Sequence, residues 1–283
     1  MSKLDIQPIL KWVGGKRQLI KDIVPLIQQH KISTYVEPFI GGGAILFDIQ
    51  PQNAVINDFN TELINLYTVI KNEPEALINA LTAHSKSHNK DYYYEVRGWD
   101  REDTYSTRTN VEKAARTVYL NKTCFNGLYR VNSNGFFNSP CGDYKNPNIV
   151  NAALIRNLSS YFNSANIIMK CGDYKQALQN LDENAFVYLD PPYMPISKSA
   201  SFVGYTKGGF DYDKQKELKS ECDKLTEQRI KFLQSNSDCP KIRDLYKDYT
   251  IITVKANRHI NSDASKRGAI NEVLIHNFNK VVK

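Results

Sequence analysis

The stretch "TYVEPFIGGGAILFDI", residues 34–49, places three consecutive glycines between a short β-favouring run and a second apolar run. We predict a strand over 34–39 and the start of a helix in 44–49. Glycine lets the backbone turn tightly and approach a ligand closely, and the N-terminus of the following helix offers free N–H groups. This order is typical of cofactor-binding α/β folds, although a packed turn explains the glycines nearly as well.

The rest of the chain continues the alternation of strands and helices. Residues 61–72, "TELINLYTVIKN", carry apolar side chains at helical spacing. Further strand-like runs lie at 53–59, 166–173, 185–190, 249–256 and 271–278. Strands separated by helical stretches indicate a sheet covered on both faces. We therefore predict an α/β, Rossmann-like fold with a mixed, mostly parallel sheet.

Two segments break this alternation. Residues 74–150 are polar, aromatic and rich in Asn, Arg and Lys, with few strand-like runs. We interpret them as a smaller, mainly helical domain inserted into a discontinuous α/β domain formed by 1–73 and 151–283. Residues 194–213, "MPISKSASFVGYTKGGFDYD", show little periodicity and are predicted to be a mobile flap or a disordered connection.

Composition excludes several classes of protein. The 283 residues are 41% hydrophobic and 24% charged, as in soluble proteins, and no apolar run has the length of a membrane span or signal peptide. We expect a cytoplasmic protein with no membrane partner. Its five cysteines are widely spaced without a CxxC pair, which predicts reduced thiols and no metal site. The net charge of +7, with positive excess near both ends, is compatible with a nucleic-acid partner.

Asp58 ends the second predicted strand, within "VINDFN". A carboxylate at this position can accept hydrogen bonds from both ribose hydroxyls of an adenosine. Its alternative role is to cap the helix that begins near Thr61. Together with the glycines, Asp58 favours a cofactor that contains adenosine. "GGGAIL" lacks the third glycine of the GxGxxG pattern, which argues against a nicotinamide dinucleotide.

The stretch "VYLDPPYMP", residues 187–195, ends a predicted strand at Asp190 and follows it with two prolines. The strand delivers the carboxylate to the edge of the sheet where open α/β folds bind ligands. The prolines fix the backbone and hold it away from helix. This arrangement suits the binding of an amino group on a flat heterocycle. The Asp190 carboxylate and the Pro191 carbonyl can accept its two N–H bonds, and the ring of Tyr193 can stack on the heterocycle.

Several motifs in one order resemble the DNA adenine-N6 methyltransferases of the Dam/DpnII type, the alpha group of the D12 class. The resemblance covers most of the chain and rests on residues 10–20 "LKWVGGKRQLI", 36–48 "VEPFIGGGAILFD", 56–60 "INDFN", 121–142 "NKTCFNGLYRVNSNGFFNSPCG" and 189–193 "LDPPY". It implies a methyltransferase fold, with S-adenosyl-L-methionine as methyl donor and an adenine in double-stranded DNA as acceptor.

Matching motif positions also imply roles for individual residues. The expected cofactor contacts are Trp12, Lys16, Phe39, Gly41, Gly43, Asp58, Asp173 and Asp190. The expected catalytic segment is Asp190, Pro191, Pro192 and Tyr193. The expected DNA contacts are Lys11, Phe125, Asn126, Leu128, Arg130 and Pro140. Arg130 suits a bidentate contact to guanine, or alternatively a phosphate or a surface ion pair. The resemblance favours a GATC-like site.

The implied chemistry needs positioning more than acid–base power. Adenine N6 is a poor nucleophile, and hydrogen bonds from N6 to Asp190 and to the Pro191 carbonyl would free its lone pair and stabilise developing positive charge. Because the atom is inaccessible inside a duplex, the base must be flipped out and stacked on Tyr193. We expect no metal. The resemblance implies either a Dam-like role or a restriction–modification role, in which an endonuclease acts on the same site without contacting this protein.

Three alternatives stay open at this point. Cytosine-N4 methylation needs the same grip on an amino group, although its enzymes more often carry serine in place of Asp190. Methylation of an amine on RNA or protein disagrees with the long basic and aromatic segment at 74–150. A non-catalytic module that binds DNA or the cofactor disagrees with the intact D-P-P-Y sequence.

Overall fold

The computed structural model describes residues 3–12, 14–195, 210–257 and 269–278. Its centre is a seven-stranded sheet in the order β3-β2-β1-β4-β5-β7-β6. The strands are β1 (Tyr35–Glu37), β2 (Asn53–Asp58), β3 (Asn166–Cys171), β4 (Phe186–Leu189), β5 (Lys231–Ser237), β6 (Thr250–Asn257) and β7 (Ala269–His276). Neighbours from β3 to β5 pair in parallel, and β7 is antiparallel to both β5 and β6. The predicted mixed, mostly parallel sheet is confirmed.

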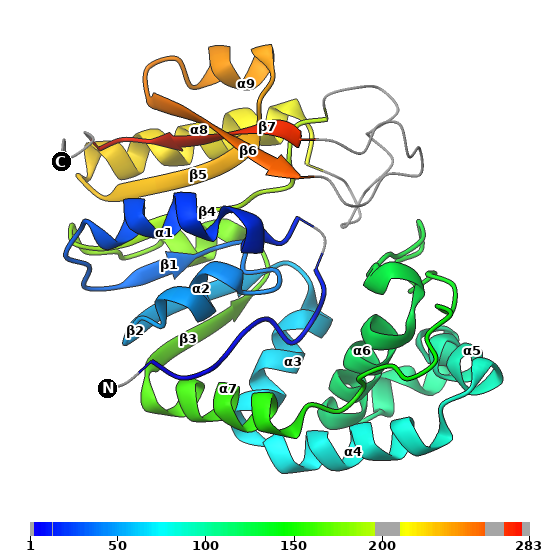
Figure 1. Cartoon of the computed structure of the whole chain (residues 1–283). Coiled ribbons are helices and arrows are strands. Elements are labelled where there is room, and N and C mark those ends of the chain that lie inside the picture. Colours follow the sequence, from blue (N-terminus) through cyan, green and yellow to red (C-terminus); the bar gives the residue numbers. More distant parts are fainter. Residues whose placement is uncertain (1–2, 13, 196–209, 258–268, 279–283) are drawn as a thin grey trace.

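The sheet alternates its buried side chains between two apolar layers. On β4, Tyr188 packs into one layer while Val187 and Leu189 pack into the other, as the period of two along a strand requires. The first layer is covered by α1 (Ile20–Gln28), α2 (Ala44–Ile49), α3 (Thr61–Asn72) and α7 (Ala152–Ser164). The second is covered by α8 (Tyr212–Glu227) and α9 (Pro240–Leu245). The sheet is therefore covered on both faces (Figure 1).

Strand β5 is the one element of the sheet that the sequence pattern did not predict. Its second half, "QSNS", is polar, yet the side chains from Gln234 to Ser237 are at most 2% exposed. Ser235 and Asn236 are tolerated because they have dedicated partners: Ser235 bonds the Tyr188 hydroxyl, and Asn236 bonds Gln215 in α8. A polar strand with its partners elsewhere in the chain gives no hydrophobic signal.

Helices also dominate the first part of the segment that was predicted as an insertion. It contains α4 (Pro74–Ser87), α5 (Lys90–Gly98) and α6 (Asn110–Thr123), which Figure 1 shows beyond α3, away from the sheet. Leu77 in α4 and Val118 in α6 belong to the same apolar core as Leu63 in α3. From residue 124 the chain is largely irregular, with antiparallel bridges between Cys124 and Cys141 and between Val131 and Phe137. The boundaries 74–150 stay a prediction.

Two further expectations from composition concern the described residues. All five cysteines are free thiols. None of the helices in the described ranges combines the length and the apolarity needed to cross a membrane. The predicted flap at 194–213 lies mostly outside the described residues, because only its first two and last four positions are described.

The glycine turn after β1 has a conformation that only glycine adopts without strain. Gly43 precedes α2 with a φ of 72°, and a Cβ atom there would lie 2.6 Å from Cε2 of the buried Phe47 ring. We expect Gly43→Ala to lower the free energy of unfolding by about 2 kcal/mol, through left-handed strain and displacement of that ring. Urea unfolding followed by circular dichroism measures this change.

Gly98 provides a matched control for that substitution. It lies at the end of α5 with a φ of −67°, and a Cβ atom there would meet nothing within 4 Å. Gly98→Ala should leave stability unchanged or raise it slightly, because alanine has the higher helix propensity. Equal stability losses in the two variants would contradict the conformational explanation for Gly43.

Candidate functional site

The predicted site residues meet at the carboxyl edge of the parallel strands. In the sheet β1 lies between β2 and β4 (Figure 1). The glycine turn after β1 is therefore flanked by Asp58 at the end of β2 and Asp190 after β4. The chain turns to opposite sides of the sheet from this point, since β2 and β3 follow on one side and β4 and β5 on the other. Such a switch point is where open α/β sheets bind ligands.

Asp190 forms an ion pair with Lys16, a lysine of the N-terminal segment. Lys16 Nζ lies 2.9 Å from Asp190 Oδ1, and the two side chains are 7% and 19% exposed. The same ammonium lies 4.7 Å from the centroid of the Tyr193 ring and donates to the carbonyl of Gly14. Two residues predicted as cofactor contacts, one of which is also the predicted catalytic carboxylate, therefore form a single buried charge pair.

Burial controls the ionisation of this carboxylate. It raises the pKa of Asp190 to about 6, while the positive charge of Lys16 acts in the opposite direction and the carboxylate of Glu272 raises the pKa further. Glu272 also accepts a hydrogen bond of 2.7 Å from the Tyr193 hydroxyl. Because Glu272 lies on β7, the antiparallel strand fixes both the Tyr193 ring and the local electrostatics.

The glycine turn and Asp58 are connected directly. The Gly41 N–H donates to Asp58 Oδ2 at 3.0 Å, and the Tyr67 hydroxyl donates to the Gly41 carbonyl at 2.7 Å. The other carboxylate oxygen accepts from the Asn60 N–H, also at 3.0 Å. Burial raises the pKa of Asp58, and these backbone donors partly offset the rise. The N-cap of α3 is Asn60, not Asp58, so the carboxylate is positioned beside the turn instead of capping the helix.

Trp12 covers this turn from the N-terminal segment. A Cβ atom on Gly41, whose φ is 48°, would lie 3.0 Å from Trp12 Cδ1. The indole also contacts the ring of Tyr129, with centroids 4.9 Å apart. Trp12 thus lies between the glycine turn and the segment predicted to read DNA.

Phe39 and Asp173 lie at the same edge but have local partners. Phe39 stacks on Tyr174 with ring centroids 5.1 Å apart and contacts the edge of Phe210 at 6.0 Å. Asp173 is exposed and caps the 3-10 helix Tyr174–Leu178 by accepting from the Lys175 N–H at 2.9 Å. The cap explains Asp173 without a ligand, so its cofactor role stays a prediction.

The residues predicted to contact DNA form one surface. The buried amide of Asn121 bonds both backbone groups of Lys11, each at 2.9 Å, and donates to the Gly127 carbonyl at 3.0 Å. This amide brings Lys11 beside the turn Phe125–Gly127, where Asn126 has a φ of 58°. Phe125 is 56% exposed, and its N–H donates to the Pro140 carbonyl at 2.9 Å.

Arg130 and Leu128 complete this surface. The exposed Arg130 donates from Nε to Asn138 Oδ1 at 2.8 Å and from Nη2 to the Asn138 carbonyl at 3.2 Å. Leu128 is partly buried, and its carbonyl accepts from the Ser139 hydroxyl. The guanidinium is therefore oriented by its own hairpin, and within the described residues its Nη1 group makes no hydrogen bond.

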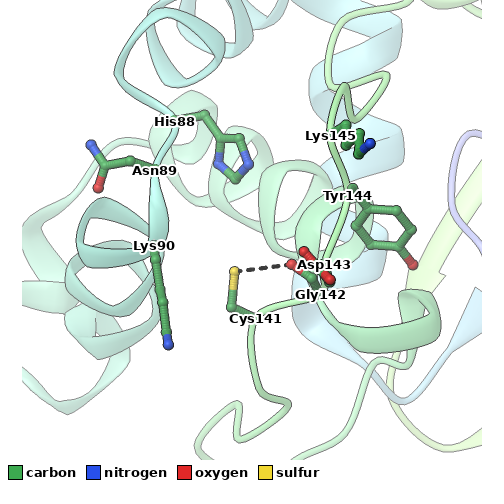
Figure 2. Close-up of a pocket in the computed structure, with 8 residues that line it drawn as sticks. All are labelled: His88, Asn89, Lys90, Cys141, Gly142, Asp143, Tyr144 and Lys145. Carbon is green, nitrogen blue, oxygen red and sulfur yellow. Dashed lines mark hydrogen bonds between the residues drawn. The ribbon is translucent and has the colours of Figure 1, made fainter.

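A cavity of about 460 Å³ opens beside the same segment, between the start of α5 and residues 141–145. Figure 2 shows Lys90 and Lys145 on opposite sides of it, with Cys141 and Asp143 between them. Neither lysine was singled out from the sequence. Its lining carries two lysines and one carboxylate, Asp143, so the cavity adds net positive charge next to Pro140 in the chain.

The structure adds residues that sequence reasoning missed. Glu272 and Tyr67 hold Tyr193 and Gly41, and Asn121 holds Lys11. The sequence held no signal for Asn121, because its helical stretch "ARTVYLNKT" mixes polar and apolar residues and the partners of the amide lie in other segments.

Comparison with known proteins gives a consistent set of relatives. Residues 12–260 match the model of the D12 class N6 adenine-specific DNA methyltransferases. The type II methyltransferase M1.LlaDCHI of Lactococcus lactis subsp. cremoris is 43% identical over 98% of this chain and 97% of its own. M.MjaIII of Methanocaldococcus jannaschii is 37% identical over 97% and 100%. The DNA adenine methylase of Escherichia coli K12 is 31% identical over 94% and 93%.

Proposed function

Because the chain belongs to the D12 class of N6 adenine-specific DNA methyltransferases, we propose that it transfers a methyl group from S-adenosyl-L-methionine to N6 of an adenine flipped out of duplex DNA. The proposal rests above all on the position of Asp190, which lies at the carboxyl edge of the sheet, next to the glycine turn and 2.9 Å from Lys16.

The residues at this edge suit the proposed cofactor. Lys16 and Asp190 offer opposite charges to the carboxylate and ammonium of a methionine moiety, and the Asp58 carboxylate suits ribose hydroxyls. Trp12, Phe39, Gly41 and Gly43 would line the same site, and Asp173 lies at its border. When bound, the cofactor supplies an electrophilic methyl group on a sulfonium.

The catalytic segment would act by accepting hydrogen bonds. Asp190 Oδ and the Pro191 carbonyl would accept from the two N–H bonds of the target amine, which frees the nitrogen lone pair and stabilises the positive charge that develops. As the sulfur–methyl bond breaks, the cofactor would leave as a thioether, and the methylated nitrogen would release one proton to solvent. Tyr193, held through its hydroxyl by Glu272, offers a fixed ring on which the flipped base stacks. Positioning the amine close to the methyl group would supply the rate enhancement, so no covalent enzyme intermediate is needed.

We expect the rate of this reaction to depend on the ionisation of Asp190. The value of kcat/KM should fall as the pH drops through about 6, the pKa of the buried carboxyl, because the protonated form loses an acceptor for the amine.

The contribution of Asp190 to the free energy of unfolding has the opposite pH dependence. Because its pKa is higher in the folded state than in the unfolded state, Asp190 stabilises the fold most at low pH, and this contribution is lost as the pH rises through about 6.

Glu272→Gln tests the electrostatic origin of this pH dependence. The substitution removes the negative charge that raises the pKa of Asp190 and keeps an oxygen acceptor for the Tyr193 hydroxyl. The acidic limb of the pH profile of kcat/KM should therefore move to lower pH. An unmoved limb would show that Glu272 does not set the ionisation of the catalytic carboxylate.

We further propose that residues 121–142 and Lys11 read a GATC-like site, for a restriction–modification role. The type II relatives are 43% and 37% identical to this chain, compared with 32% for the adenine methylase of Vibrio cholerae, and this order favours a type II enzyme whose cognate endonuclease acts on the same site. Expression in a methylation-free host, followed by single-molecule sequencing, tests the modified base and the site. N6-methyladenine within GATC is the expected result, whereas N4-methylcytosine or unmodified DNA would refute the proposed reaction.

A further inference from the structure

Three buried polar side chains outside the predicted site hold the backbone that follows Asp190. Gln215 in α8 and Asn236 and Ser237 in β5 are at most 2% exposed. Gln215 Nε2 donates to the Pro192 carbonyl at 2.9 Å, and Asn236 Nδ2 donates to Gln215 Oε1 at 3.0 Å. Both ends of the Gln215 amide are therefore used, and its orientation is fixed by Asn236.

The same network holds the backbone of Met194. The Met194 N–H donates to Asn236 Oδ1 at 3.2 Å, and the Ser237 hydroxyl donates to the Met194 carbonyl at 2.6 Å. Asn236 Oδ1 also accepts from the Ser237 N–H at 2.9 Å. A buried network in which each amide is used at both ends rigidifies what it touches.

The network leaves the Pro191 carbonyl available, next to the catalytic carboxylate. Pro191 and Pro192 have no N–H, and the carbonyls of Pro192 and Met194 are held by Gln215 and Ser237. Within the part of the chain that the structure describes, no hydrogen bond reaches the Pro191 carbonyl. Its oxygen is the group that the proposed reaction uses as the second acceptor for the amine.

We infer that Gln215, Asn236 and Ser237 are positioning residues, which aim the Pro191 carbonyl and the Asp190 carboxylate at the target amine. This inference rests on the proposed function, since it assigns the network to the methyl-transfer step. The competing explanation is that the network only stabilises the packing of α8 against β5. If the network positions the catalytic segment, breaking it slows methyl transfer. If it only stabilises packing, breaking it lowers stability and leaves the rate of methyl transfer unchanged.

Gln215→Met tests the inference most directly. The substitution keeps length and volume but removes the donor to the Pro192 carbonyl, so residues 191–194 lose one of their anchors. We expect the single-turnover rate of methyl transfer, with cofactor and DNA saturating, to fall on the order of 10²-fold, as for a misplacement near 1 Å. The dissociation constants of S-adenosyl-L-methionine and DNA should change less than about threefold.

Ser237→Ala and Ser235→Ala form a matched pair on one strand. Both hydroxyls are fully or nearly fully buried in β5, but Ser237 bonds the Met194 carbonyl whereas Ser235 bonds the Tyr188 hydroxyl at 2.8 Å. The two substitutions should lower the melting temperature similarly. Only Ser237→Ala should slow single-turnover methyl transfer, by about tenfold.

Each result has a definite meaning. A slower transfer step in Gln215→Met and Ser237→Ala, with Ser235→Ala at the wild-type rate, supports positioning. Wild-type rates in the first two variants, or equal slowing in all three, would overturn it while leaving the proposed function intact. If Gln215→Met does not fold, the comparison of Ser237→Ala with Ser235→Ala decides between the two explanations. A wild-type protein that methylates no DNA would instead refute the proposed function itself.

Discussion

Asp190→Ala is expected to reduce methyl transfer to DNA by at least about 10³-fold. The substitution removes one of the two oxygen acceptors that would hold the target amine, and the loss of a single preorganised transition-state contact costs about 10²–10³-fold by itself. It also leaves the ammonium of Lys16 without its carboxylate at 2.9 Å. Because that ammonium lies where the cofactor is proposed to bind, a second loss adds to the first.

The fold should survive this substitution. The raised pKa of Asp190 shows that burying its charge is unfavourable, so removing the carboxylate offsets part of the cost of leaving Lys16 unpaired. Incorporation of labelled methyl groups into DNA measures the loss, and circular dichroism checks the fold. Asp5→Ala, which removes an exposed carboxylate far from the site in the sequence, serves as the control. Full activity in Asp190→Ala would overturn the catalytic assignment.

Asp190→Asn separates charge from geometry at the same position. Asparagine retains one oxygen acceptor but loses the negative charge that would stabilise the developing cation. We expect activity between that of the wild type and that of Asp190→Ala, without the acidic limb near pH 6. Activity equal to that of Asp190→Ala would mean that the charge, and not the acceptor alone, carries the effect.

The sequence predicted the positions of the acids but not their partners. Asp58 and Asp190 follow strand-like runs, and parallel strands bring their carboxyl ends to one edge of the sheet. The local sequence pattern was therefore sufficient to predict where these two acids lie. The pairing of Asp190 with Lys16 and of Tyr193 with Glu272 depends on contacts between distant segments, the second spanning 79 positions. No local periodicity encodes such a contact.

Strand β5 shows the same limit for the fold. Hydrophobic alternation reports burial only when the buried side chains are apolar. Ser235, Asn236 and Ser237 are buried against partners in distant segments of the chain, so the local sequence pattern could not predict this strand. These polar side chains include the ones that hold the catalytic segment, so the pattern failed where the proposed chemistry needs buried hydrogen bonds.

Arg130→Ala is expected to relax the choice of DNA site. The guanidinium is exposed on its hairpin, and Asn138 holds its Nε and Nη2 groups at 2.8 and 3.2 Å, which presents the planar edge in a fixed direction. A bidentate contact from arginine to guanine O6 and N7 contributes about 1–3 kcal/mol of discrimination against other bases. The ratio of kcat/KM between the mapped site and its single-base variants should therefore fall by up to about 10²-fold at one position.

Two further variants distinguish base reading from simple electrostatic attraction. Arg130→Lys keeps the positive charge but loses the planar pair of donors, so it should not restore discrimination. Lys145→Ala removes one positive charge from the cavity next to that segment and should weaken binding to all sequences about equally, without changing the ratio. If Arg130→Ala behaves like Lys145→Ala, the arginine contacts the DNA backbone and another residue of 121–142 reads the guanine, because a contact to phosphate cannot distinguish one base pair from another.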